Sequence, residues 1–339
     1  MNQWLAAAPA FLMLAAGTPA FSQAGGKLQM NVGTVAPEGS PWHTVIQKTR
    51  DEWAKATGGG VALRVYAGGV LGDEVEMIRK VRLGQLHAVG LSAVGLASIE
   101  PGALAFGIPM LLDSYEEFDY VRDRLAPKLE ALLEKRGFVT LQWSDVGWVR
   151  FFTKTPVRTP DDLRKLKLFT SAGDPEAERL YKELGMQAVP LSVTDMLPSL
   201  QTNMIQAFDV PPLFALLDQS FALAKHMLDL RWAPLPGATL VSRRAWDKVP
   251  EEQRAKLLQL SRAAAERERA AIRKLGEDAV VELQKRGLKV VPVDAAALAM
   301  WRSEAEKAYP RMRGRLIPAD LFDEAVRLRN EYRARQGRK

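Results

Sequence analysis

The feature that most constrains the fold is a repeated alternation of short apolar segments with helical patterns. Residues 28–34 alternate apolar and polar side chains as a strand does. Ser40 and Pro41 then occupy the cap and first position of a helix whose apolar residues, from Trp42 to Trp53, recur at spacings of three and four. The series continues with strand patterns over 61–66, 88–94 and 138–143 and an amphipathic pattern over 115–136. This alternation predicts an α/β class, in which helices cover a parallel sheet.

The alternation restarts at Gly147, which indicates a second lobe. Strand patterns cover 148–154, 166–170, 187–191 and 205–210, with a helix over 176–184, and 235–243 resembles a strand that returns to the first lobe. The 339 residues are also about twice the common length of one domain. We therefore expect lobe I to comprise 27–146 with 235–275, and lobe II to comprise 147–234 with 276–339.

Residues 251–286 contain no proline and keep one apolar stripe at helical spacing. A helix of ~35 residues rises about 50 Å. Such a helix is long enough to span both lobes.

The N-terminal segment predicts a signal peptide over 1–24. Residues 1–26 carry no charged side chain, and an apolar run over 4–16 ends at Gly17 and Pro19. Small residues suited to the signal peptidase precede both Gln23 and Gly25, although the segment lacks the usual Lys or Arg at its start. The alternative is an uncleaved anchor, but a membrane span needs about 20 apolar residues and this run is shorter. No later segment reaches that length without a charge or a proline.

Charge and cysteine content exclude several kinds of site. The 47 Lys and Arg residues exceed the 40 Asp and Glu residues by seven, but this excess is dispersed and nowhere interleaved with stacking aromatics, so nucleic acid is not an expected partner. The chain has no Cys, which excludes disulfides and thiolate metal ligands. His43, His87 and His226 lack metal-binding spacing, and no cofactor is indicated.

Arg150 is the strongest single candidate for a binding residue. It lies within the aromatic strand pattern over 148–152, where a cation is costly unless it meets an anion. Its guanidinium could hold a ligand carboxylate through two parallel hydrogen bonds. The alternative is a pairing with a structural carboxylate such as Asp145. The glycine-rich stretch 68–72 is a weaker candidate, and Asp73 and Glu74 after it indicate a capped turn rather than a phosphate site.

Several segments carry motifs that occur together in one protein family. The turn over 69–76 is similar to the pattern G-x-LG-x-x-x-E, and 106–111 to the segment f-x-x-P-f-l. Residues 155–167 resemble the signature k-x-P-i-x-t-P-e-D-L-k-G-l-K, and 81–88 and 184–191 match two further stretches. Together these segments resemble the DctP-type substrate-binding proteins of tripartite ATP-independent periplasmic (TRAP) transporters. The resemblance covers essentially the whole chain after the predicted signal peptide.

This resemblance implies a two-lobed, periplasmic-binding-protein-like α/β fold with a central cleft that closes around a small organic acid. Arg150 aligns with one ligand-contacting arginine of the family, but Phe169 stands where a second arginine clamps the ligand carboxylate. The family's D-G-x-E loop is replaced by Asp209-Val210-Pro211-Pro212. We therefore expect an aromatic ligand or a monocarboxylate. The expected ligand-binding residues are Arg150, Phe169, Asp209, Ser92, Trp42, Trp148, Phe214 and Trp232.

The predicted function is capture of that ligand in the periplasm and its delivery to the integral membrane subunits of a TRAP transporter. One alternative is a periplasmic sensor whose closed complex is read by a membrane receptor. The other is an enzyme that uses the same cleft, for which Asp145, Asp174 and Asp209 could supply acid–base groups.

Overall fold

A computed structural model describes residues 27–337, so the predicted signal peptide lies outside the described residues. Three parallel strands begin the first lobe: β1 (Leu28–Thr34), β2 (Val61–Tyr66) and β3 (Ala88–Ser92). Helices α1 (Pro41–Ala56), α2 (Glu74–Leu83) and α3 (Ala93–Ile99) connect and cover them. Ser40 caps α1 as predicted, because its hydroxyl accepts a hydrogen bond from the His43 N–H.

Two long strands run through both lobes. Strand β4 (Phe138–Thr153) pairs with β9 (Ala233–Ser242) in antiparallel fashion and then continues into lobe II beside β7 (Ala207–Val210). The sheet order is β2-β1-β3-β9-β4-β7-β5-β6. The sheet is therefore mixed and not purely parallel as predicted, because β9 and β4 are antiparallel to their neighbours.

The two strands expected over 138–143 and 148–154 are one continuous strand. The pairing of β4 with β9 shifts register between Thr140 and Gln142 and again between Asp145 and Gly147. Gly147 adopts φ +130°, a backbone conformation that L side chains rarely adopt. These irregularities let the strand bend between the lobes without ending, which is a common use of bulges.

Lobe II repeats the layered arrangement around β4. Strands β5 (Lys167–Ser171) and β6 (Gln187–Leu191) are parallel to each other and to β7, while β8 (His226–Leu228) pairs with β4 and with β10 (Lys289–Val291). The helices and helical turns of this region are α5 (Pro160–Leu163), α6 (Pro175–Glu183), η2 (Val193–Asp195), α7 (Met196–Gln201), α8 (Pro212–Leu217) and η3 (Ser220–Ala222).

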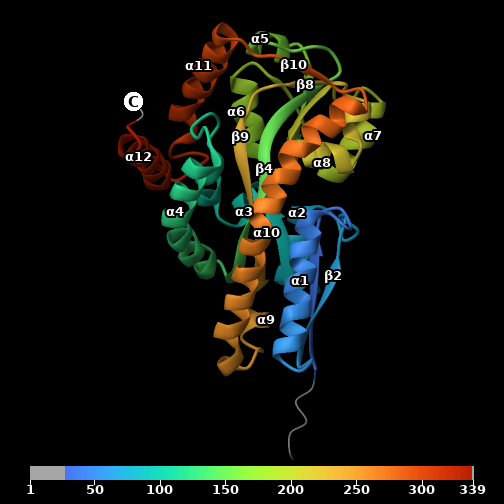
Figure 1. Ribbon diagram of the computed structural model, residues 1–339, viewed down its shortest axis with the longest axis vertical. Helices are drawn as coiled ribbons and strands as arrows, with labels where there is room; N and C mark the ends of the chain where they lie inside the picture. Colours follow the sequence, from blue (N-terminus) through green and yellow to red (C-terminus); the bar gives the residue numbers. More distant parts are fainter. Residues whose placement is uncertain (1–26, 338–339) are drawn as a thin grey trace, which may run out of the picture.

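The long helix is confirmed as α10 (Glu251–Lys285), which follows the short α9 (Arg243–Trp246). Figure 1 shows α10 running along the molecule beside α1 at one end and α8 at the other. Leu257 packs in a core with β1 and α1, whereas Leu283 packs in a core with β4 and β7. One helix therefore contributes to the cores of both lobes.

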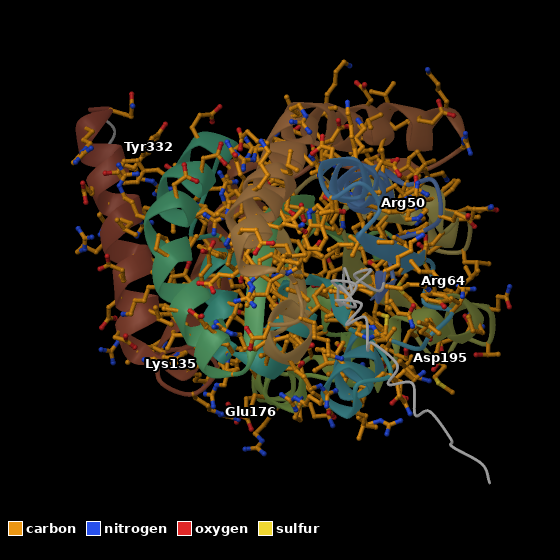
Figure 2. The ribbon with its side chains drawn as sticks, turned by 90° about the horizontal axis from the view of Figure 1, so that it is seen from below. Arg50, Arg64, Lys135, Glu176, Asp195 and Tyr332 are labelled. Atoms are coloured by element: carbon orange, nitrogen blue, oxygen red, sulfur yellow. The ribbon has the colours of Figure 1, made fainter. Side chains whose placement is uncertain are left out.

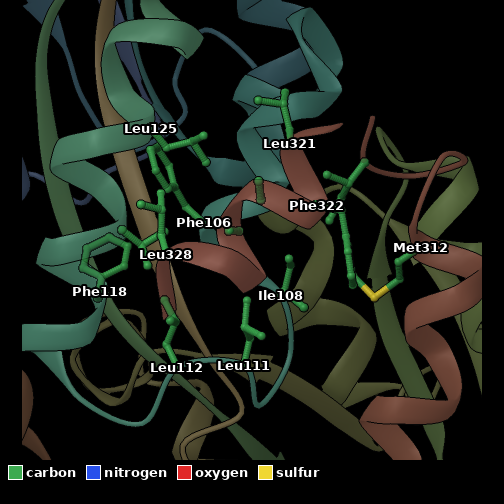
Figure 3. Close-up of a cluster of buried hydrophobic side chains, with 14 of the residues drawn as sticks. Phe106, Ile108, Leu111, Leu112, Phe118, Leu125, Met312, Leu321, Phe322 and Leu328 are labelled. Atoms are coloured by element: carbon green, nitrogen blue, oxygen red, sulfur yellow. The ribbon is translucent and has the colours of Figure 1, made fainter. Parts of the chain in front are cut away.

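The C-terminal helices form a third layer. Helix α11 (Ala295–Met312) contacts α5 and α6, and α12 (Ala319–Arg335) packs on α4 (Tyr115–Lys135) and on the helical turn η1 (Pro101–Gly107). Phe106, Phe118 and Leu328 meet in the apolar cluster between them (Figure 3). Helix α12 thus contacts α4 and η1, which belong to the predicted lobe I. The assignment of 276–339 to lobe II stays a prediction.

The charged side chains are dispersed around the molecule. In Figure 2, Arg50, Arg64, Lys135 and Glu176 lie at separate places around its outline. No helix among residues 27–337 is both long enough and apolar enough to cross a membrane.

Candidate functional site

A cleft of about 180 Å³ lies where the two lobes meet. Lobe I contributes the ends of β1 and β3, one face of α1 and the start of α2, and lobe II contributes β5, β7 and α8. The crossing strands β4 and β9 form the wall between them. The polar and aromatic lining residues are Thr34, Trp42, Asp73, Glu74, Ser92, Gln142, Ser144, Phe169, Ser171, Asp209, Phe214 and Thr239.

Trp42 joins helix α1 to the crossing strand. Its indole lines the cleft, and Nε1 donates a hydrogen bond to the carbonyl oxygen of Asp145 at 3.0 Å. The ring is 8% exposed and packs near Val45 and Leu213. The polar atom of the ring is thus satisfied by the protein, and the ring offers an apolar surface.

Ser92 and Glu74 form a buried polar pair in lobe I. The N–H of Ser92 donates to one Glu74 carboxylate oxygen at 2.5 Å, and the Ser92 hydroxyl donates to the other at 2.9 Å. The Gly95 N–H is a further donor. Burial raises the pKa of Glu74, and the hydrogen bonds from Ser92 and Gly95 oppose that shift. A Cβ at Gly95 would approach Glu74 Oε2 to 2.7 Å, so glycine is needed for this close contact.

Three predicted residues line the cleft from lobe II. Phe169 in β5, 7% exposed, and Phe214 in α8 present aromatic rings, and Asp209 stands near the end of β7. Removal from water raises the pKa of Asp209 to about 7, against a smaller opposing effect of its own backbone N–H. Asp209 is therefore partly protonated near neutral pH.

Arg150 does not line this cleft, and its role as a carboxylate anchor stays a prediction. Its side chain pairs with Asp229 and lies in a separate surface depression beside Arg231 and Arg302. The extra residue in β4 between Asp145 and Gly147 accounts for the different facing of Arg150, because a bulge reverses which side chains face each side of a strand. Asp145, the alternative partner considered for Arg150, pairs instead with Arg122 and Arg273.

Trp148 and Trp232 are also absent from the cleft lining, so the structure does not place them as its aromatic walls. Trp148 packs against Tyr115 with ring centroids 5.8 Å apart. Trp232 lies between Phe151 and Trp301, with centroid distances of 5.3 and 5.7 Å. Both rings are core residues. Trp42, Ser92, Phe169, Asp209 and Phe214 lie in the cleft, and their role in ligand binding stays a prediction.

Sequence reasoning missed the uncharged polar side chains of the crossing strands. Gln142 and Ser144 line the cleft from β4, and Thr239 lines it from β9. The Gln142 amide oxygen accepts a hydrogen bond from Thr49 at 3.1 Å. In the sequence, these residues can be recognised only as polar side chains at alternate positions of a buried strand. That pattern points to a cleft only when the strand is known to cross between the lobes.

No three His, Asp or Glu side chains group as metal ligands anywhere in the described part of the chain. Glu74 is engaged by Ser92, and Asp73 caps α2 by accepting the Glu76 N–H at 2.8 Å. The cleft lining thus combines apolar side chains and aromatic rings with neutral polar groups and the three acidic residues Asp73, Glu74 and Asp209.

Two α/β lobes that are joined by crossing strands and enclose a cleft define the class of two-lobed solute-binding proteins. Residues 32–315 match the family model of bacterial extracellular solute-binding protein, family 7 (DctP). The chain belongs to this family.

Individual relatives agree with that assignment. A solute-binding protein of Chromohalobacter salexigens is 23% identical over 77% of this chain and 78% of its own length. A TRAP periplasmic solute-binding protein of Xanthobacter autotrophicus, solved with β-D-galacturonate, superposes with a TM-score of 0.82 at 21% identity and covers 89% of this chain and 99% of its own. A Desulfovibrio salexigens protein with bound orotic acid gives a TM-score of 0.82 at 19% identity over 91% and 99%.

Proposed function

We propose that this chain captures a small organic solute between its lobes and presents the closed complex to the integral membrane subunits of a TRAP transporter. The observation that carries the proposal is a cleft lined from both lobes. Organic acids, the ligands of the galacturonate-bound and orotate-bound structures, are the first class to test.

The way in which the lobes are joined supports closure around a ligand. Strands β4 and β9 and helix α10 pass between the lobes, and β4 bends at Gly147. A ligand that contacts Trp42 on one side and Phe214 on the other binds best when the lobes approach. Closure of this kind is the usual hinge motion of periplasmic binding proteins.

The proposed site of action is the periplasm, after cleavage of residues 1–24. The apolar N-terminal run and the extracellular family support this location. N-terminal sequencing of the protein from a periplasmic extract tests it. A start near residue 23 or 25 is expected, whereas a start at residue 1 would contradict cleavage.

The binding function is tested by thermal unfolding of the mature protein against succinate, sugar acids, aromatic acids, aromatic amides and amino acids. A ligand at about 100 times its Kd adds about 2.7 kcal/mol to the free energy of unfolding. Isothermal titration with Phe214→Ala then locates the site, because this ring lines the cleft. We expect at least tenfold weaker binding.

Leu217→Ala is the matched control, since Leu217 lies on the same helix, is 39% exposed and is not a lining residue. Equal effects of the two variants would place the binding site outside the cleft. Recovery of the ligand unchanged after long incubation separates binding from catalysis.

Delivery to a transporter is distinguished from sensing by reconstitution. Ligand uptake by vesicles that contain the two membrane subunits is expected to require this protein. Uptake that does not depend on it, together with a ligand-dependent response of a membrane receptor, would favour the sensor.

A further inference from the structure

The cleft contains no cationic side chain. Among residues 27–337, those that line it include no Lys, Arg or His, although Asp73, Glu74 and Asp209 are present. Asp145 of β4, between the lining residues Ser144 and Val146, pairs with Arg122 of α4 and Arg273 of α10, neither of which lines the cleft. A buried carboxylate ligand would therefore meet acidic groups without a counter-ion, which is unfavourable.

Two helix N-termini at the cleft, those of α2 and α3, are occupied by the protein's own carboxylates. Such termini attract anions through their free N–H groups. Here Asp73 accepts from the Glu76 N–H at the start of α2. Glu74 accepts from the N–H groups of Ser92 and Gly95 at the start of α3. The backbone donors at these two termini are therefore already engaged.

What the cleft offers instead is apolar surface with a few neutral polar groups. Trp42, Phe169 and Phe214 supply rings from three different elements, and Gln142 and Thr239 supply an amide and a hydroxyl. An apolar cavity of about 150 Å³ is large enough to hold benzene. At about 180 Å³, this cleft accommodates one substituted ring.

We propose that the cleft binds an uncharged, ring-containing body and that any carboxylate of the ligand stays in solvent at the cleft mouth. This inference rests on the proposed function, in that it takes the interlobe cleft as the solute site. It narrows the solute class to aromatic amides, alcohols or carbonyl compounds and to aromatic acids whose carboxylate is separated from the ring by a linker.

Titration of near-isosteric probes tests the inference. Benzoate, benzamide and benzamidine differ mainly in charge. In 4-phenylbutanoate and 4-phenylbutanamide, the carboxylate or amide group is separated from the ring by a linker. We expect benzamide to bind at least tenfold more tightly than benzoate, and the amide-to-acid ratio to fall below about threefold for the longer pair. Phe214→Ala should weaken benzamide binding and Leu217→Ala should not.

Each other outcome overturns the inference. Benzoate binding as tightly as benzamide would show that the cleft accepts a buried anion, and tighter binding of benzamidine would show that its carboxyl groups recruit a cation. If succinate or galacturonate binds in a Phe214-dependent manner and no aromatic amide does, the inference fails while the proposed function stands. If no compound in the full panel binds, the proposed function fails as well.

Discussion

Arg273 on helix α10 donates a hydrogen bond from Nε to Asp145 Oδ2 on strand β4 at 2.6 Å. Arg122 of α4 approaches the other oxygen of Asp145 at 3.3 Å, and both arginines also pair with Asp119. Asp145 is only 2% exposed. The network therefore fixes three elements at the point where β4 passes from one lobe to the other, directly behind the cleft wall.

Replacing Asp145 with Asn should strongly destabilise the fold. Loss of the carboxylate leaves the Arg122 and Arg273 guanidinium groups to share Asp119, with the exposed Asp123 as a further partner of Arg122 alone. Breaking a buried ion pair in this way costs about 3–5 kcal/mol. Urea unfolding at pH 7 measures the loss.

The control is Asp323→Asn, which removes the partner of Arg313 in a pair whose side chains are 50% and 53% exposed. An exposed pair contributes about 0–1 kcal/mol. Similar losses in the free energy of unfolding for the two variants would show that the Asp145 network stabilises the fold no more than an exposed ion pair does.

Arg150→Ala is expected to leave ligand affinity within about twofold of the wild-type value. Arg150 pairs with Asp229 in a depression separate from the cleft, so no lining contact is lost. Isothermal titration with the tightest ligand of the panel provides the measurement. A tenfold loss in Arg150→Ala, with unchanged stability, would restore Arg150 as the anchor.

The contrast between α10 and β4 shows what the sequence could and could not predict. The apolar stripe over 251–286 determines a helix regardless of its surroundings, and α10 matches it within one residue. In β4, however, Gly147 resembles a chain break, and the register shift beside it reverses the facing of every later side chain. Sequence alternation alone therefore does not predict which way Trp148 and Arg150 face.

Phe169 lies on the short regular strand β5 and lines the cleft, and alternation is informative there because no irregularity intervenes. Glu74 illustrates a second limit. Its position in the first turn of α2 predicts an interaction with the N-terminus of that helix. Its carboxylate instead accepts a hydrogen bond from the Ser92 N–H at the start of α3. Only the folded chain brings Ser92 and Gly95 to it.

Stability should depend on pH through Asp209. Its pKa is raised to about 7 in the folded protein from an ordinary value of 3.8. The folded state thus holds the proton more tightly than the unfolded chain, so this contribution is fully present below about pH 4 and is lost as the pH rises through 7. An asparagine at this position does not titrate, so Asp209→Asn removes the loss of stability that accompanies deprotonation.

We expect the variant to gain stability relative to the wild type between pH 4 and pH 8, by on the order of 2–4 kcal/mol. Urea unfolding of both proteins at pH 4, 6 and 8 measures the trend. A difference that stays constant with pH would contradict the assignment of a raised pKa to Asp209.

Phe169→Arg should convert the cleft into a carboxylate site. Phe169 lines the cleft from β5, so an arginine there supplies the cation that the other lining residues lack. Its planar guanidinium can donate two parallel hydrogen bonds to one carboxylate. We expect at least tenfold tighter benzoate binding and weaker benzamide binding, both measured by isothermal titration.

Phe169→Met is the matched control, because it changes the ring without adding charge, and it should weaken both ligands. Phe169 is 7% exposed, so the arginine could impair folding. Ser171→Arg, two residues along the same strand and also in the cleft lining, then provides the same test. If both arginine variants fold and neither gains benzoate affinity, the lack of a cation does not determine which ligands this cleft accepts.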